Sequence, residues 1–245
     1  MTVTREAFLA GLVVLAIYIA LRPDAPTNLG RLIDDGVYLA VGKAIAHGEG
    51  YRSIHMVGAP VQVKFPPLLP ALYALFWLGT DSLMTVTRLA LAASIAATAA
   101  SAALLWYYAR NVLGTQPLLT AFFVIAPLAS EHTMFYFSGP ISEPWMLLGW
   151  AAALLLMERL RRGRQARREP VAAAVALGLV LAATVLARSQ AIAIAIGMLA
   201  CLPMVRAGWR STCAAVAATA VPLATWALVH AAMAARGPLS TQPDQ

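Results

Sequence analysis

Long apolar stretches separated by short polar segments make up most of this chain. A helix needs about 20 residues to cross a hydrocarbon core that is about 30 Å thick. Stretches that reach or approach this length lie at roughly 4–21, 84–109, 113–131, 141–157, 170–187, 190–206 and 212–234. The pattern predicts an all-α integral membrane protein in which a single membrane domain, 1–245, contains about seven transmembrane helices.

The segment 65–81, "FPPLLPALYALFWLGTD", admits two interpretations. Its apolar part is about 14 residues long, or about 21 Å of helix, and it is bounded by prolines and a glycine. If it crossed the membrane, Arg5 and the arginine-rich segment 158–169 would fall on opposite faces. If it lies along the interface, the arginines between the helices fall on one face. We therefore predict an interfacial helix here, with aromatic side chains suited to the headgroup layer.

Composition and charge support a membrane protein and orient it. The chain has 60% hydrophobic and 12% charged residues and a mean hydropathy of +0.72, which excludes an ordinary soluble domain. Much of the net charge of +7 lies in "ERLRRGRQARRE", residues 158–169. Dense arginine in a short loop stays in the cytoplasm, so we interpret this charge as a topology signal and not as a nucleic-acid site. A role in binding lipid headgroups is the alternative.

This orientation predicts a multi-pass protein of the plasma (inner) membrane. The largest loop, 22–83, is then extracytoplasmic and carries interfacial helices, and 235–245 forms a tail. The loop contains two adjacent carboxylates, Asp34 and Asp35, in a chain with few charges. Asp34 could cap the amphipathic helix that follows. One cap uses one carboxylate, so capping does not explain both residues.

Three further charged residues are expected on the same membrane face. Glu143 begins the fourth span in "SGPISEPW", and Arg188 interrupts apolar sequence, where a charge needs a polar cavity or a partner. Lys64 precedes a proline pair in the first outside loop. Simpler explanations remain open: a favourable charge at a helix N-terminus for Glu143, and side chains that extend to the interface at helix ends for Arg188 and Lys64.

Other chemistries have little support in the sequence. The four histidines show no metal-binding spacing, and the chain has no GxxxxGK[ST], GxSxG or CxxC motif. Cys201 and Cys213 are expected to be free thiols at the cytoplasmic side. We therefore assign no metal site to the histidines.

The order of several short motifs resembles the C-type polytopic membrane glycosyltransferases. The nearest branch contains the protein mannosyltransferases, aminoarabinose transferases and lipopolysaccharide-core galacturonosyltransferases. The matching features are the acidic pair Asp34-Asp35 followed by Tyr38, Gly48 to Tyr51, "KFPPLLPAL", Arg88, "SGPISEPW" and "LARSQA". They span most of the chain, which corresponds to the amino-terminal membrane module of those enzymes, so we expect a truncated or minimal relative.

The resemblance implies a function at the extracytoplasmic face. Such enzymes move a sugar from a polyprenyl-phosphate carrier to a lipid, glycan or protein acceptor, with inversion expected here. Asp34 or Asp35 would be the catalytic base, with Asp35 preferred because Asp34 is better placed as the cap. Arg188, and more weakly Lys64, would bind the donor phosphate. Glu143 would position the acceptor or share a divalent cation with the acidic pair; metal dependence is left open.

Two other classes of function remain as alternatives. A non-catalytic membrane subunit or scaffold would need no acidic pair, and a transporter of a lipid-linked substrate would place charges near helix breaks. Transporter sites usually lie near the bilayer midplane between repeated halves, and the sequence shows no repeat. Convergence of the acidic pair, Glu143 and Arg188 on one face would favour the enzyme.

Overall fold

The computed structural model describes residues 2–21, 33–166 and 170–235. The regular elements in these ranges are all helices, which confirms the all-α part of the predicted fold class. An isolated antiparallel bridge joins Arg52 and Val61. In chain order the helices are α1 (Val3–Leu21), α2 (Ile33–Ala46), α3 (Leu68–Trp77), α4 (Leu83–Asn111), α5 (Pro117–Leu128), α6 (Glu131–Phe137), α7 (Glu143–Gln165), α8 (Val171–Ala187), the 3-10 helix η2 (Ser189–Ala191), α9 (Ile192–Ala200) and α10 (Trp209–Ala234).

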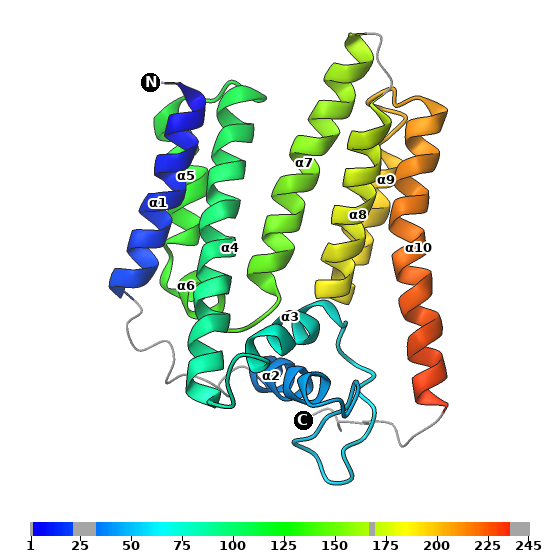
Figure 1. Ribbon diagram of the computed structural model, residues 1–245. Coiled ribbons are helices and arrows are strands. Elements are labelled where there is room, and N and C mark those ends of the chain that lie inside the picture. The colour runs from blue at the N-terminus through cyan, green and yellow to red at the C-terminus, as the bar shows by residue number, and fades with distance from the viewer. Residues whose placement is uncertain (1, 22–32, 167–169, 236–245) are drawn as a thin grey trace.

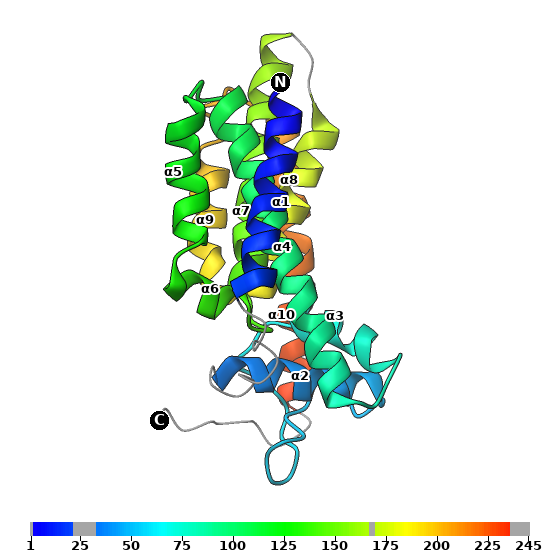
Figure 2. The same cartoon turned by 90° about the vertical axis from the view of Figure 1, so that its left-hand side faces the viewer.

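The long helices stand side by side in a row. Helix α1 packs on α4, α4 on α7, α7 on α8, and α8 on α10, which is the order seen from left to right in Figure 1. Figure 2, which looks along this row, shows α5 and α9 on the same side of it. Helices α2 and α3 pack on each other and lie across one end of the row. The molecule is therefore a helical layer with a small helical platform at one end.

Within the residues that the structure describes, three helices are long and apolar enough to cross a membrane: α1, α4 and α10. The bent pair α5–α6 raises this to four if it counts as one broken span. The prediction of seven spans is thus not supported. Helix α8 has 17 residues and α9 has 9, short of the roughly 20 that a bilayer requires. The predicted span 113–131 instead divides into α5 and α6, which meet at 58°.

Small residues bring neighbouring helices close together. A Cβ atom on Gly178 in α8 would lie 2.3 Å from the carbonyl oxygen of Ala215 in α10. The hydroxyl of Thr219 on α10 also donates a hydrogen bond to the carbonyl oxygen of Gly178, at 3.2 Å. A Cβ on Gly149 in α7 would likewise overlap Thr184 in α8. Glycine at these positions permits the close contact that joins α7, α8 and α10.

The platform of α2 and α3 has an aromatic core. Tyr38, Tyr73 and Trp77 are buried there, and the indole N–H of Trp77 donates to the carbonyl oxygen of Leu39 at 3.0 Å. The helix expected within 65–81 is present as α3, and Figure 1 shows it lying crosswise to the long helices. The core also contacts Trp145 at the beginning of α7 and Trp226 on α10. These contacts hold the platform against the ends of α7 and α10.

Candidate functional site

Arg188 occupies a break between two helical segments. Helix α8 ends at Ala187, and Arg188 has an extended backbone, with φ −149° and ψ 118°, before η2 begins. Its amide N–H still donates to the carbonyl oxygen of Thr184, and its own carbonyl oxygen accepts from the amide of Ala191, both at 3.0 Å. The break lets the Arg188 side chain reach the beginning of α7 instead of following the axis of α8.

The guanidinium of Arg188 contacts three side chains. Nη1 donates to Glu143 Oε1 at 2.6 Å and to Ser142 Oγ at 2.9 Å. Nε donates to Gln190 Oε1 at 2.8 Å. The side chains of Arg188 and Glu143 are 23% and 25% exposed. These bonds use Nε and Nη1, and within the described part of the chain the two N–H groups of Nη2 have no partner. The ion pair therefore fixes Arg188 while Nη2 stays available for a ligand.

Tyr38 connects this ion pair with helix α2. Its hydroxyl donates a long hydrogen bond, 3.5 Å, to Ser142 Oγ. Burial raises the pKa of Tyr38 to about 12, and the hydrogen bond to Ser142 opposes that rise. The charge of Asp34 raises this pKa further, that of Arg188 lowers it and that of Glu143 raises it. The acidic segment of α2 and the Arg188–Glu143 pair therefore act on the same buried hydroxyl.

The two adjacent carboxylates have different environments. Asp35 is buried, with 2% of its surface exposed, and its Oδ1 accepts from the amide of Gly36 at 2.6 Å. Asp34 is partly exposed. Helix α2 begins at Ile33, so Asp34 lies within its first turn and the cap position falls outside the described residues. The helix dipole favours a negative charge in this turn, which replaces capping as the purely structural explanation for Asp34.

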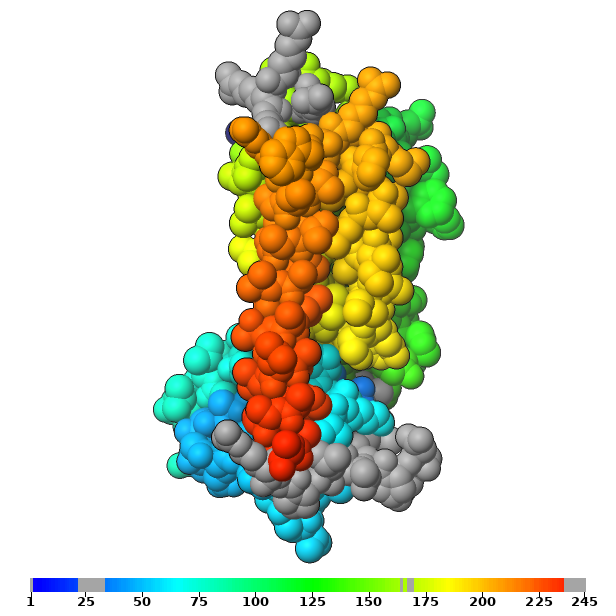
Figure 3. All heavy atoms as spheres, turned by 90° about the vertical axis from the view of Figure 1, so that its right-hand side faces the viewer, coloured from blue at the N-terminus to red at the C-terminus, as the bar shows by residue number. Residues whose placement is uncertain are grey.

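Lys64 lies at the wall of a neighbouring pocket of about 320 Å³. The pocket is lined mostly by apolar side chains from the segment 63–66, the end of α8, η2 and α10, and it includes Ser189, directly after Arg188. Figure 3 shows the end of α10, in red, against the cyan segment that carries Lys64. The Lys64 ammonium lies 5.6 Å from the centre of the Phe65 ring, a cation–π distance. Lys64 and Ser189, the residue after Arg188, thus line one largely apolar pocket.

The structure does not assemble the divalent-cation site that the sequence left open. No group of three His, Cys, Asp or Glu side chains within 2–21, 33–166 and 170–235 is placed to hold a metal ion. Glu143 is instead paired with Arg188, and Asp35 is buried. The contact that Glu143 makes in the structure is therefore one that holds the Arg188 side chain in place.

The structure adds Ser142, Tyr38 and Gln190 to the site residues expected from the sequence. Ser142 and Glu143 are adjacent in "SGPISEPW", and Gln190 follows Arg188 by two residues, so both could have been found from their neighbours. Tyr38 lies one turn after Asp34 and was noted only as part of a motif. Its link to Ser142 joins residues 104 positions apart, which no local pattern in the chain connects.

Basic residues gather at the end of the row opposite this site. Arg110 at the end of α4 pairs with Glu6 at the beginning of α1, at 2.9 Å. Arg162 near the end of α7 donates to the carbonyl oxygen of Asn111, at 3.3 Å. The charged cluster around Arg188 and the arginine-rich end therefore lie at different ends of the molecule (Figure 1). The chain matches no family model, no curated protein and no solved structure.

Proposed function

We propose that this chain is a glycosyltransferase that transfers a sugar from a polyprenyl-phosphate carrier to an extracytoplasmic acceptor, with inversion. The observation that carries the proposal is the guanidinium of Arg188, which is held by Glu143 and Ser142 and keeps Nη2 unengaged among the described residues. The next residue, Ser189, lines a largely apolar pocket together with Lys64. A cation beside an apolar pocket suits a ligand that joins a phosphate to a hydrocarbon chain.

In the proposed reaction an acceptor hydroxyl oxygen attacks the anomeric carbon of the sugar. The new carbon–oxygen bond forms as the bond from that carbon to the carrier phosphate breaks, and the bonding electrons leave with the phosphate. Arg188 neutralises the departing phosphate, and Lys64, which lines the apolar pocket, acts as a second cation. The hydroxyl proton passes to a carboxylate of the acidic pair.

The environments of the acidic pair favour Asp34 as this base. The preference for Asp35 rested on Asp34 being the helix cap, and Asp34 lies inside the first turn. Asp35 is 2% exposed, whereas Asp34 is partly exposed and can be reached by an acceptor. Glu143 positions Arg188 through their ion pair.

The proposal places the site at the extracytoplasmic face of the plasma membrane, in a multi-pass protein. Support comes from the arginines at the opposite end, around Arg110 and Arg162, because basic residues at helix ends favour the cytoplasm. Helices α7 and α8 stand between α4 and α10 in the row, with α9 on one side of it, and would complete the membrane layer with them.

The test is incubation of purified protein with a panel of radiolabelled polyprenyl-phosphate sugars and membrane acceptors. Asp34→Asn keeps the shape of the side chain and removes its charge and basicity. We expect this variant to keep wild-type abundance and to lose transfer by at least about 10²-fold, the usual scale of general-base catalysis. Asp35→Asn, measured in parallel, decides between the two carboxylates.

Asp81→Asn is the matched control. Asp81 is a highly exposed carboxylate that pairs with His47 at 3.3 Å, and it has no contact with the Arg188 cluster within the described ranges. This variant should retain transfer. Equal transfer by wild type, Asp34→Asn and Asp35→Asn would remove the acidic pair from the mechanism. No transfer from the whole panel would favour the non-catalytic subunit or the transporter of a lipid-linked substrate.

A further inference from the structure

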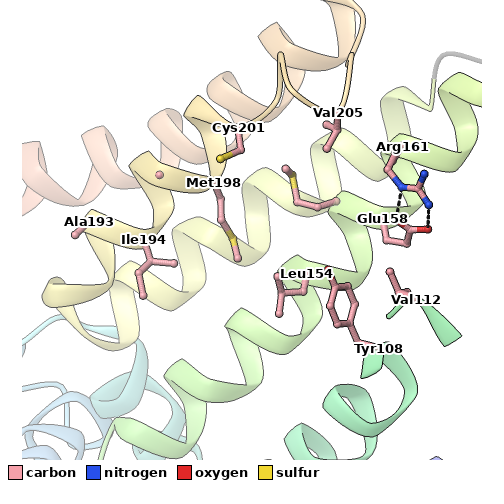
Figure 4. A pocket seen from close by; sticks show the side chains of 12 residues that line it. Tyr108, Val112, Leu154, Glu158, Arg161, Ala193, Ile194, Met198, Cys201 and Val205 are labelled. Carbon is pink, nitrogen blue, oxygen red and sulfur yellow. Dashed lines mark hydrogen bonds and ion pairs between the residues drawn. The ribbon is translucent and has the colours of Figure 1, made fainter. Parts of the chain in front are cut away.

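A second pocket lies near the arginine-rich end, away from the Arg188 cluster. It has a volume of about 690 Å³ and lies between α4, α7 and α9. Figure 4 shows Tyr108, Leu154, Ile194 and Met198 around its interior, with Glu158 and Arg161 at one end. The volume falls within the range of about 300–1,000 Å³ that is typical of ligand sites. Its walls are apolar over most of their length.

A second, more basic pocket adjoins the apolar one and is called its mouth below. An adjoining pocket of about 410 Å³ shares Arg161 and Val205 with the first and adds Arg206, Gln165 and Met204. The combined cavity therefore has an apolar part between the helices and a polar part at their ends. Such a division matches a molecule with a hydrocarbon chain at one end and a charged group at the other.

The mouth carries a net positive charge. Arg161 donates to Glu158 through Nε at 2.6 Å and Nη2 at 2.8 Å, and Arg162 donates to the same carboxylate at 2.5 Å. The single negative charge of Glu158 is thus shared by two arginines. Arg161 is 45% exposed and, among the described residues, the remaining N–H groups of its guanidinium have no partner. Arg206 is exposed and adds a further cation.

The backbone of Arg206 gives an independent observation. Arg206 has φ +54°, a left-handed conformation that favours glycine. The turn is closed by hydrogen bonds from the amides of Arg206 and Ala207 to the carbonyl oxygens of Pro203 and Leu202, at 2.9 and 3.0 Å. An arginine at a position suited to glycine is strained, and such strain concentrates at functional sites.

We propose that the pocket between α4, α7 and α9 binds an acyl chain of an anionic phospholipid whose phosphate is held by Arg161 and Arg206. The apolar walls accept the chain, and the arginines at the mouth complement the phosphate. Basic pockets between membrane helices suit anionic headgroups for this reason. The site is separate from the Arg188 cluster and does not depend on the proposed transferase activity.

The test measures lipid retention by the purified full-length protein in detergent with native mass spectrometry. The probes are phosphatidylglycerol and phosphatidylcholine with the same acyl chains. Wild type should bind phosphatidylglycerol at least about tenfold more tightly. The double variant Arg161→Gln, Arg206→Gly should lose this preference. It keeps the Arg162–Glu158 pair and places glycine where the backbone favours it, so the fold is expected to be retained.

A second variant tests the apolar part without changing charge. A Cβ atom added to Gly197, which lines the pocket, would meet nothing within 4 Å. Gly197→Leu should therefore fill the pocket with little strain and weaken both lipids by about tenfold or more. Glycerol phosphate, which has the charge without the chain, should not displace bound phosphatidylglycerol.

Arg210→Gln is the matched control. Arg210 is exposed, stacks on Trp209 and does not line either pocket. This variant should bind phosphatidylglycerol as wild type does. The proposal is overturned if the two lipids bind wild type equally, if the double variant or Gly197→Leu binds them unchanged, or if Arg210→Gln has an equal effect. It is also overturned if Gly197→Leu converts a dimer to a monomer without changing lipid retention, because the pocket would then be a protein interface.

Discussion

Gly178 lies where α8 approaches α10, and its replacement by alanine should weaken this contact. The added Cβ would be 2.3 Å from the carbonyl oxygen of Ala215, 2.6 Å from the Cβ of Ala218 and 3.0 Å from the amide nitrogen of Thr219. Two of these are backbone atoms, which cannot move aside as a flexible side chain can. The helices must therefore separate.

The size of the effect follows from the distances. Ordinary contact begins at 3.4 Å, so relief of the overlap with Ala215 requires a shift of about 1.1 Å (3.4 − 2.3). Such overpacking costs about 1–3 kcal/mol. A shift of this size also separates the Thr219 hydroxyl from the carbonyl oxygen of Gly178, now 3.2 Å away, but the hydroxyl keeps its 2.9 Å bond to Ala215 in its own helix, so this adds little. The better helix propensity of alanine returns about 1 kcal/mol. The expected net loss is about 1 kcal/mol.

Gly197→Ala in α9 is the matched control. The substitution is the same, but the new Cβ meets nothing within 4 Å. Helix propensity alone then applies, so this variant should be stabilised by about 1 kcal/mol. Thermal unfolding in detergent, followed by tryptophan fluorescence, compares the two. We expect Tm to fall by about 2–4 °C for Gly178→Ala and to rise by about 2–4 °C for Gly197→Ala.

The signs of the two Tm shifts test whether α8 and α10 make this close contact. If both variants shift Tm in the same direction by the same amount, propensity outweighs packing and α8 and α10 do not make the close contact described. If Gly178→Ala is more stable than wild type, the contact between Gly178 and Ala215 is absent in the folded protein.

Three further predictions concern the site and the topology. In a double-mutant cycle of Glu143→Gln and Arg188→Gln, unfolding in detergent should show a coupling free energy of about 1–2 kcal/mol, because the pair is only about a quarter exposed. If the two substitutions have additive effects on the free energy of unfolding, the ion pair contributes nothing to stability. Tyr38, whose burial raises its pKa to about 12, keeps its proton in the folded state while the unfolded chain loses it near pH 10. Burial of Tyr38 therefore does not lower the free energy of unfolding below about pH 10, and it lowers this free energy as the pH rises toward 12. Tyr38→Phe should lessen this alkaline loss of stability. Parallel curves of unfolding free energy against pH for wild type and variant would contradict this. In a background without the two native cysteines, Val57→Cys should react with an impermeant thiol reagent in intact cells and Gln165→Cys should not; the reverse pattern would invert the predicted topology. Both positions are exposed.

Local pattern was enough to locate most helices. The expected spans 4–21, 84–109 and 212–234 correspond closely to α1, α4 and α10, and α3 lies within the segment 65–81. Arg188 was expected to interrupt an apolar run, and α8 ends one residue before it. These features depend on neighbours within a few turns, because apolar length, proline and isolated charge act over short distances along the chain.

The local sequence pattern predicted some residues of the candidate site but not how they meet. Glu143 and Arg188 were both chosen from sequence, but their pairing at 2.6 Å depends on how α7 packs on α8. The difference between Asp34 and Asp35 depends on which face of α2 is buried, and the number of spans depends on bends and helix lengths that hydropathy does not resolve.

The sequence by itself determined an all-helical, apolar protein with its arginines concentrated between helices. The tertiary structure decided which distant residues meet. The ion pair at Arg188 joins residues 45 positions apart, and the bond from Tyr38 to Ser142 spans 104. The lipid-sized pocket takes walls from α4, α7 and α9, which no local pattern connects. The physical reason is that helix formation follows nearby residues, whereas pockets and charge pairs follow the close packing that glycines such as Gly178 permit between helices.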